Sequence, residues 1–297
     1  MLDFRIETFL TVCETMNFTK AARRLHITQP AVSQHIHALE QSYQTKLFAY
    51  AGKQLILTEA GRLFLQTAAA MRHDARHLRD ALGQLSSRRY LHFGATLTIG
   101  AYMMPRHLSG LLKREPETRI RMIMANTAEL LRLLDRGELD FAIVEGFFPK
   151  QSYESLWYRT ERYLPVCAPD YRFSRSVVRL EDLLWERLLV REPGSGTREV
   201  LERALEERNL QMQDFPYLTE LGGLDVIKAL VTGGMGVSFF YEPVVRSELS
   251  AGTLREIPLA DCSISHDFSF LWRKGSVFGP YYREVFHLLG LDGPEGA

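Results

Sequence analysis

Apolar residues recur at helical spacing through the first 85 residues of the chain. Within residues 2–16, Phe4, Phe9, Leu10 and Val12 fall on one side of a predicted amphipathic helix. After residue 90 the pattern changes, and short apolar runs typical of strands alternate with helical segments. The sequence therefore predicts an all-α N-terminal part followed by an α/β part.

Residues 18–41 predict two short helices joined by a tight turn. Thr19 is a candidate N-cap for a helix over residues 20–26, because its hydroxyl can accept from an amide that has no helical partner. Thr28 is a candidate N-cap for the second helix. Pro30 fits the first turn of that helix, where no amide donor is needed.

The second of these helices has two unlike faces. Val32, Ile36 and Leu39 cluster on one side of a helical wheel and predict a buried face. The opposite side is polar and nearly uncharged, and its residues are Pro30, Gln34, His37 and Gln41, with Ser33 at the edge. Such a face suits the reading of base edges in a DNA major groove, because glutamine pairs with adenine through two hydrogen bonds and serine donates or accepts. An ordinary helical hairpin with a polar outer surface is the alternative.

Basic residues flank this predicted reading helix. Lys20, Arg23 and Arg24 on the preceding helix are placed to meet phosphates, which would position the pair without selecting a sequence.

Gly52 predicts a hairpin of two short strands, and Lys53 at its tip would touch a phosphate or the minor groove. The hairpin is therefore interpreted as a wing.

A long helix is expected next, with Thr58 as its N-cap. Its apolar residues recur at spacings of 4, 3, 4, 3, 4 and 3: Phe64, Ala68, Met71, Ala75, Leu78, Leu82 and Leu85. Three heptads predict a two-stranded seam and hence a homodimer, with a rod of about 40 Å. Two reading helices on one rod imply a pseudo-palindromic site with half-sites about one helical turn apart. A single helix packed on its own chain is the alternative.

The C-terminal part is predicted as strands alternating with helices after a polar hinge at residues 86–90. Predicted strands cover residues 91–95, 119–125, 141–144, 188–191, 237–241 and 268–272, and a second run of strands and helices starts near 163–166. One predicted helix follows the first strand and ends before Pro116. Four more cover residues 127–136, 197–209, 224–231 and 280–289.

Hydroxyl-bearing residues follow several of these predicted strands. Ligands in open α/β sheets bind beyond the carboxyl ends of strands, where helix N-termini point. The candidate effector-binding residues at such positions are Thr96, Thr98, Asn126, Thr127, Glu145, Ser195, Gly196 and Thr197. If the two hydroxyl-rich segments face each other, they form a site for a small anion or carboxylate.

Neighbouring residues leave the chemistry of this site open. Arg198 would favour an anion, whereas Glu145 would pair with an amine or with Arg198 itself. In the plainer alternative, Thr98 and Thr197 are only helix caps, and Gly194 and Gly196 are only turn residues.

Composition narrows the class of protein. Residues 1–89 contain 12 Lys and Arg against 7 Asp and Glu, a net charge of +5, and residues 90–297 contain 24 against 29, a net charge of −5. The positive part coincides with the predicted DNA-binding part. Cys13, Cys167 and Cys262 lie far apart and in no metal-ligand spacing, as expected for free thiols in a reducing compartment.

Membrane and secreted classes are not favoured. Asp3, Arg5 and Glu7 interrupt any signal-peptide core, and no run of about 20 apolar residues exists. A cytoplasmic protein without membrane contact is expected.

No catalytic or metal-ligating set is predicted. Ser195 lacks the glycines two positions away on each side that a nucleophile elbow requires. The glycine-rich segment 233–236 lacks the lysine of a phosphate-binding loop. An α/β enzyme or a solute-binding receptor that uses the region between the strand ends remains the alternative to a DNA-binding regulator.

The N-terminal residues resemble those of a known family. The segments Phe18-Thr19-Lys20-Ala21-Ala22, Thr28-Gln29-Pro30-Ala31-Val32-Ser33, Leu39-Glu40, Leu47-Phe48 and Leu57-Thr58-Glu59-Ala60-Gly61, together with Leu25, are similar to the helix-turn-helix of LysR-type transcriptional regulators. The family usually has arginine two residues after the phenylalanine of Leu47-Phe48. This chain has Tyr50 there, so one expected phosphate contact is in doubt.

The resemblance implies an organisation and a set of contacts. It implies a winged helix-turn-helix DNA-binding domain over residues 1–58 and a linker helix for dimerisation over 59–89. Residues 90–297 would form a regulatory domain of two Rossmann-like lobes of the periplasmic-binding-protein type, one over about 90–162 and 266–297, the other over about 163–265. The DNA contacts expected from pattern and resemblance together are Lys20, Arg24, Thr28, Gln29, Pro30, Ala31, Ser33, Gln34, His37 and Lys53.

The resemblance also implies partners. These are double-stranded DNA, a second copy of the chain, a tetramer of such copies, RNA polymerase and a small-molecule effector, with no cofactor. The segment 191–198 resembles the subgroup of regulators of sulfur assimilation and carbon fixation, which suggests an oxyanion or metabolite as the effector.

Overall fold

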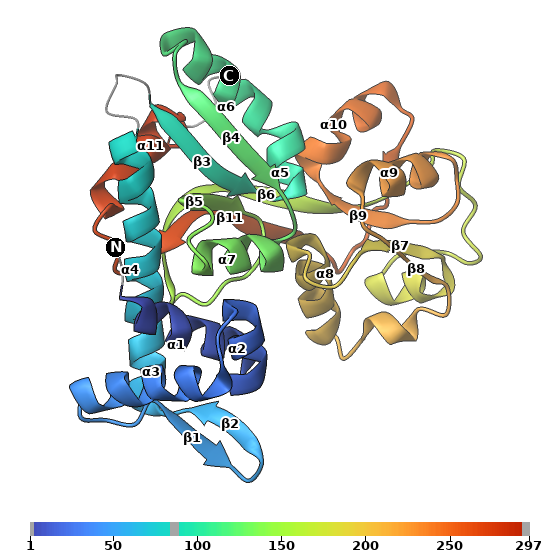
Figure 1. The fold of residues 1–297 in the computed structure, drawn as a ribbon. Coiled ribbons are helices and arrows are strands. Elements are labelled where there is room, and N and C mark those ends of the chain that lie inside the picture. Colours follow the sequence, from blue (N-terminus) through green and yellow to red (C-terminus); the bar gives the residue numbers. More distant parts are fainter. Residues whose placement is uncertain (1–2, 84–88, 293–297) are drawn as a thin grey trace.

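The computed structural model describes residues 3–83 and 89–292. Figure 1 shows a helical N-terminal part at one end of a long helix and a larger α/β part beside that helix. The N-terminal part contains α1 (Phe4–Thr15), α2 (Phe18–Leu25), α3 (Gln29–Ser42), β1 (Phe48–Ala51) and β2 (Gln54–Leu57). The long helix is α4 (Glu59–Gly83).

The N-terminal helices enclose a small apolar core. Phe9, Val32 and Ile36 are buried in it, as the helical pattern predicts. The ring of Phe9 lies 5.3 Å from that of Phe48 and 4.8 Å from that of Phe64. Phe4 differs from its prediction, because 64% of it is exposed and only its ring edge meets His35.

The predicted N-cap is confirmed for the second of the two short helices and wrong for the first. The hydroxyl of Thr28 accepts from the amide of Ala31, as expected. The first helix begins at Phe18 rather than Lys20, and Asn17 caps it by accepting from the Lys20 amide. The prediction of Thr19 as this cap is therefore wrong.

The wing is a two-stranded antiparallel hairpin. Ala51 pairs with Gln54, so Gly52 and Lys53 form a two-residue turn. Gly52 has a φ of +63°, which glycine adopts without steric cost.

The first lobe of the α/β part is built on a five-strand region of one sheet in the order β6, β11, β5, β3, β4. Its strands are β3 (Tyr90–Ala95), β4 (Arg119–Met124), β5 (Phe141–Val144), the first half of β6 (Tyr153–Cys167) and β11 (Ile264–Arg273). Its helices are α5 (Leu97–Tyr102), α6 (Met104–Arg114), α7 (Thr127–Asp135) and α11 (Gly279–Leu288). The single helix expected before Pro116 is thus two helices that meet at Met103, and Pro105 lies in the first turn of the second.

The second lobe is built on shorter strands. They are β7 (Leu188–Arg191), β8 (Leu218–Leu221), β9 (Ser238–Tyr241), β10 (Arg255–Glu256) and the second half of β6. The helices are α8 (Gly196–Glu206), α9 (Leu224–Thr232) and α10 (Glu242–Ala251), and two short 3-10 helices are η1 (Leu180–Trp185) and η2 (Met212–Asp214).

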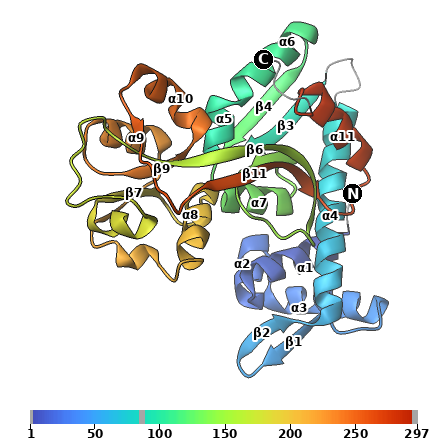
Figure 2. The same cartoon turned by 180° about the vertical axis from the view of Figure 1, so that it is seen from behind.

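Two long strands join the lobes. β6 pairs with β11 up to Tyr163 and with β9 from Tyr163 onward, so one seven-stranded sheet extends through β6 from the first lobe into the second. The strand that was expected to start near residue 163 is therefore the second half of β6, which begins at Tyr153. Figure 2 shows β6 and β11 passing side by side from one lobe to the other.

Helix α4 packs against its own first lobe as well as against the N-terminal core. His73 is buried, and its Nε2 lies 2.9 Å from the carbonyl oxygen of Leu139. Nδ1 of His77 lies 3.0 Å from a carboxylate oxygen of Asp140. Within the described residues, no helix is long and apolar enough to cross a bilayer.

Candidate DNA-reading surface and effector site

The polar face of α3 is open to solvent. Thr28, Gln29, Pro30, Gln34 and His37 are exposed, and Ala31 and Ser33 are half-buried. Gln29 Nε2 donates to Ser33 Oγ at 2.9 Å, and Gln41 Nε2 lies 3.0 Å from His37 Nε2. The hydrogen bonds of these side chains are made to other residues of α3. The side chains can therefore give up those hydrogen bonds and bind base edges instead.

A groove separates this face from the wing. It is lined by Gln29, Ser33 and His37 from α3 and by Tyr50 and Lys53 from the wing, among others. Tyr50 is 70% exposed. Its hydroxyl is therefore available at the position where the family usually has arginine.

The three basic residues of α2 expected to meet phosphates differ in their surroundings, and Arg23 is exposed. Lys20 is exposed, as is Lys53 on the wing. Arg24 instead makes an ion pair with Glu14, at 2.9 Å. The side chain of Arg24 is still 46% exposed, and only its Nη1 meets that carboxylate, so its contact with a phosphate stays a prediction.

The predicted dimer seam divides into two halves. Met71, Leu78 and Leu82 are about half-exposed, at 48%, 49% and 55%. Phe64 and Ala68 pack into the N-terminal core of their own chain, contrary to the expectation that they face a partner. Ala75 is half-buried, and Leu85 lies outside the described residues. The exposed apolar half of the helix is the part left for a second chain.

Residues from both lobes meet at a buried junction around Glu145. Thr96 and Thr98 reach it from the first lobe, and Ser195 and Thr197 from the second, and all are at most 2% exposed. Thr197 Oγ1 donates to Glu145 Oε1 at 2.9 Å, and Ser195 Oγ donates to Thr197 Oγ1 at 3.3 Å. The structure therefore brings together most of the residues that the sequence selected.

This junction leaves several polar atoms without partners. Buried oxygens with no hydrogen bond within the protein are Thr96 Oγ1, Thr98 Oγ1, Thr127 Oγ1 and Glu145 Oε2. Buried polar groups are normally paired, because an unpaired one costs about 1–3 kcal/mol. Four such atoms lie around Glu145, all from the first lobe, and they make this junction the candidate effector site.

Burial controls the charge of Glu145. Removal from water raises the pKa of this carboxyl group above its ordinary value, while the hydroxyls of Thr98, Thr197 and Thr96 act in the opposite direction. Arg191 also favours the charged form, from a greater distance. The net direction favours the neutral acid, which can donate a hydrogen bond.

The lobes touch each other directly beside this carboxyl group. A Cβ atom on Gly196 would lie 2.5 Å from the Cα of Gly146, so neither glycine tolerates a side chain at this spacing. The amide of Ala128 donates to the carbonyl of Gly194 at 3.2 Å across the same junction. Gly194 has a φ of +87° and is a turn residue, whereas Gly196 is required for close approach.

The alternative that Thr98 and Thr197 are only helix caps is wrong, and the cap among the candidates is Asn126, which that alternative did not include. Asn126 caps α7 by accepting from the Glu129 amide, and its Nδ2 donates to Glu192. Thr98 and Thr197 are not N-caps, and Thr96 and Ser195 occupy N-cap positions without a side-chain cap. The hydroxyls at the junction therefore have no capping function.

Arg198 does not reach the junction. It pairs with Glu202 at 2.6 Å and with Glu220, and it donates to the carbonyl of Arg191. Its predicted pairing with Glu145 and its predicted role in attracting an anion are both unsupported by this geometry.

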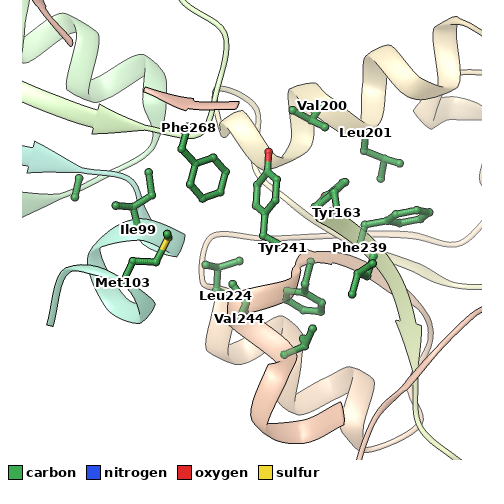
Figure 3. Packing of buried hydrophobic residues seen from close by; sticks show 14 of the residues in the cluster. Ile99, Met103, Tyr163, Val200, Leu201, Leu224, Phe239, Tyr241, Val244 and Phe268 are labelled. Carbon is green, nitrogen blue, oxygen red and sulfur yellow. The ribbon is translucent and has the colours of Figure 1, made fainter. Parts of the chain in front are cut away.

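Tyrosines complete the junction and were not selected from the sequence. Tyr241 is fully buried, and its hydroxyl donates to the carbonyl of Glu145 at 3.3 Å. Figure 3 shows its ring between Phe268 and Tyr163, at centroid distances of 4.7 and 4.8 Å. The sequence signal was a Tyr at the end of a predicted strand, which is the same rule that selected the threonines.

The second lobe contains a small cavity beside Thr197. It is lined by second-lobe residues, Tyr163 and Arg198 among them, and measures about 10 Å³, about the smallest volume that holds a water molecule. Within the described residues, no group of three or more His, Cys, Asp or Glu side chains is arranged for a metal ion.

These features define a helix-turn-helix DNA-binding protein with a two-lobed α/β regulatory domain. The family model described as the LysR substrate binding domain matches residues 85–290, and that of the bacterial regulatory helix-turn-helix protein, lysR family, matches residues 5–62. The chain belongs to the LysR family of transcriptional regulators.

Curated relatives and solved structures agree with this assignment. The chain is 30% identical over 281 residues to the regulator CbbR of Rhodospirillum rubrum, covering 93% of this chain and 91% of the relative. It is 29% identical over 273 residues to CysL of Bacillus subtilis, covering 90% and 89%. The structure of ArgP from Mycobacterium tuberculosis matches with a TM-score of 0.64 at 20% identity, covering 98% and 97%, which supports the fold alone.

Proposed function

We propose that the exposed face of α3 reads DNA bases and that the junction around Glu145 binds the effector of this regulator. Gln34, Ser33 and Gln29 are the reading residues, while Lys20 and Lys53 hold phosphates on either side. The supporting observation is a polar, solvent-exposed helix face beside a groove that a basic wing closes.

The dimer rests on the exposed apolar half of α4. Met71, Leu78 and Leu82 would pair with the same residues of a second chain and place two α3 helices on one DNA duplex. Residues 1–58, 59–89 and 90–297 are the proposed DNA-binding, linker and regulatory units, and a tetramer of these chains is a further step of the same proposal.

The effector is proposed to be a small polar molecule that carries an oxyanion. The buried hydroxyls of Thr96, Thr98 and Thr127 can donate to such a group, and Glu145 adds a donor when its carboxyl group is protonated. The observation that carries this proposal is the convergence of buried hydroxyls on Glu145, from Thr96 and Thr98 in the first lobe and from Thr197 in the second.

Binding is coupled to lobe movement in this proposal. Gly146 and Gly196 touch across the junction, so in this proposal the lobes separate there to admit the effector. An effector that binds only the open arrangement shifts the population toward it. The shift would change the spacing of the two α3 helices, and with it DNA bending and contact with RNA polymerase.

A ligand screen with paired variants tests the effector site. Metabolites that raise the melting temperature of the purified protein would be retested on the double variant Thr98→Ala and Ser195→Ala. We expect the thermal shift to be lost while binding to DNA persists. An unchanged thermal shift in the double variant would exclude these residues as ligands.

A further inference from the structure

A second cavity lies between the N-terminal domain, α4 and the first lobe. It measures about 890 Å³, within the range of small-molecule sites. Figures 1 and 2 both draw α7 above α1 and α2, with α4 passing beside α1 and α7. The cavity is therefore enclosed by parts of the chain that are far apart in sequence.

Five arginines line this cavity, and they are called the arginine cluster here. Two come from α4, one from α7, one follows α7 and one ends β11: Arg62, Arg72, Arg132, Arg136 and Arg273. Three carboxylates line the same space, those of Glu14, Glu59 and Asp135. Among the lining residues, positive charge exceeds negative charge by two.

The carboxylates are divided unevenly among the guanidinium groups, and Arg132 has its own partner in Glu129, outside the cavity lining. Glu14 alone accepts ion pairs from Arg24 at 2.9 Å, Arg72 at 3.3 Å and Arg136 at 3.6 Å. Arg72 also meets Glu7 at 3.4 Å. Asp135 is shared between Arg273, at 2.7 Å, and the hydroxyl of Tyr153.

Several guanidinium donors in this cluster stay unused. The Nε atoms of Arg72, Arg136 and Arg273 are buried and make no hydrogen bond within the protein. Arg72 and Arg273 are themselves only 6% and 5% exposed. Buried donors without acceptors favour the entry of an acceptor.

We propose that the arginine cluster binds a small multivalent oxyanion, such as a phosphorylated or multiply carboxylated metabolite, at a site separate from the lobe junction. Guanidinium groups match phosphate and carboxylate oxygens with two parallel hydrogen bonds. Leu10, Leu63 and Ala69 line the same cavity and would accommodate the apolar part of an organic anion.

The bound anion would fasten the DNA-binding domain to the first lobe. Arg72 lies on the helix that joins the two, Arg136 belongs to the lobe, and both already converge on Glu14 of α1. An anion that takes over these arginines also releases Glu14 to Arg24 of α2. The site therefore connects a metabolite to the orientation of the reading helices.

Cys13 supplies a local reporter of occupancy. It lines the cavity, whereas Cys262, also half-buried, lies in the second lobe. The full-length protein would be treated with a maleimide, with pyrophosphate or citrate present and with potassium chloride at equal ionic strength. Labelling of each cysteine would be followed by mass spectrometry.

We expect pyrophosphate or citrate to slow the labelling of Cys13 at least fivefold, with saturation, and to leave Cys262 unchanged. Arg132→Gln and Arg136→Gln, at the more exposed edge of the cluster, should each weaken the apparent affinity at least tenfold. Arg246→Gln, with the same charge change on α10, should not alter it.

Two outcomes would overturn the proposal. One is the absence of saturable protection of Cys13 with both anions. The other is protection that survives in Arg132→Gln and Arg136→Gln but disappears in Thr98→Ala, which would place the anion at the lobe junction instead. Melting temperatures of the variants within a few degrees of the parent would show that each is folded.

Discussion

At the scale of single residues, Glu145 is the group whose chemistry depends most on the fold. Burial raises the pKa of its carboxyl group, so the folded protein holds a proton that the unfolded chain releases at a lower pH. The stability contribution of that proton is fully present below the unfolded pKa. It is lost as the pH rises through the folded pKa.

Glu145→Gln should therefore stabilise the protein in a pH-dependent way. Glutamine keeps the shape and cannot ionise, so the variant should exceed the parent in melting temperature by more at pH 8 than at pH 5. Thermal unfolding across this range measures the difference. Glu206→Gln, at an exposed position of α8, is the control and should show no such trend. A difference independent of pH would mean that Glu145 is ionised throughout.

Gln34 and Lys53 test the division between reading and positioning. Gln34→Ala should reduce the preference for the best base at one position of the site by about 1–3 kcal/mol. Lys53→Ala should weaken binding to all DNA sequences alike. It should also reduce the slope of log affinity against log salt concentration by about one. Competition binding with single-base variants of a selected duplex distinguishes the two. Uniform loss in both variants would remove Gln34 from the reading residues.

The sequence identified the candidate effector-binding residues because the ends of strands and the starts of helices can be recognised from local sequence. Thr98, Ser195 and Thr197 were found from that rule alone, and the structure brings them together. Arg198 was misjudged because its partner Glu220 lies 22 positions away, on β8, and no local pattern connects them. The capping role of Asn17 was missed because Thr19, two residues later, is also a good cap.

At the scale of elements, α4 shows what a heptad pattern leaves undecided. The spacing predicts one continuous apolar face but does not say what covers it. Phe64 and Ala68 are covered by the chain's own N-terminal core, and Met71, Leu78 and Leu82 are exposed. The prediction of a dimer seam is thus narrowed to the second half of the helix.

Leu78→Glu should dissociate the proposed dimer. A carboxylate in an apolar seam loses its hydration, which costs several kcal/mol and corresponds to a weakening of about a hundredfold or more. Sedimentation velocity over a range of concentrations measures the effect. Leu112→Glu, on the exposed part of α6, is the matched control. A dimer that is unaffected by Leu78→Glu would place the interface elsewhere.

The strands were predicted well where they are short and buried. β5 and β7 match their predicted ranges because β5 is apolar throughout, β7 is apolar except for its last residue, Arg191, and polar residues bound both. β6 was found only in its second half. Its first half alternates exposed and partly buried residues, and it continues without a turn into the second lobe.

At the scale of the whole molecule, the contact between Gly146 and Gly196 sets the closed arrangement of the lobes. Gly196→Ala should force the lobes apart, because its Cβ would lie 2.5 Å from the Cα of Gly146. Overpacking of this kind costs about 1–3 kcal/mol. The amide of Ala128, which donates across the junction, should then exchange with deuterium faster.

Gly223→Ala serves as the control for this variant. A Cβ there would meet only Val226 at 3.5 Å, an ordinary contact, and the backbone is extended. Exchange at Ala128 should be unchanged in this control. If Gly196→Ala also leaves it unchanged, the two lobes are not held together by this contact.

Selection of bound sequences from a random duplex library tests the central claim, that paired α3 helices read DNA. The purified protein should enrich an inverted repeat whose half-sites are about one helical turn, or a whole number of turns, apart. Gln34→Ala should lose the preference at one position in each half-site. Enrichment of a single unrepeated site, or of no sequence at moderate salt, would contradict the account.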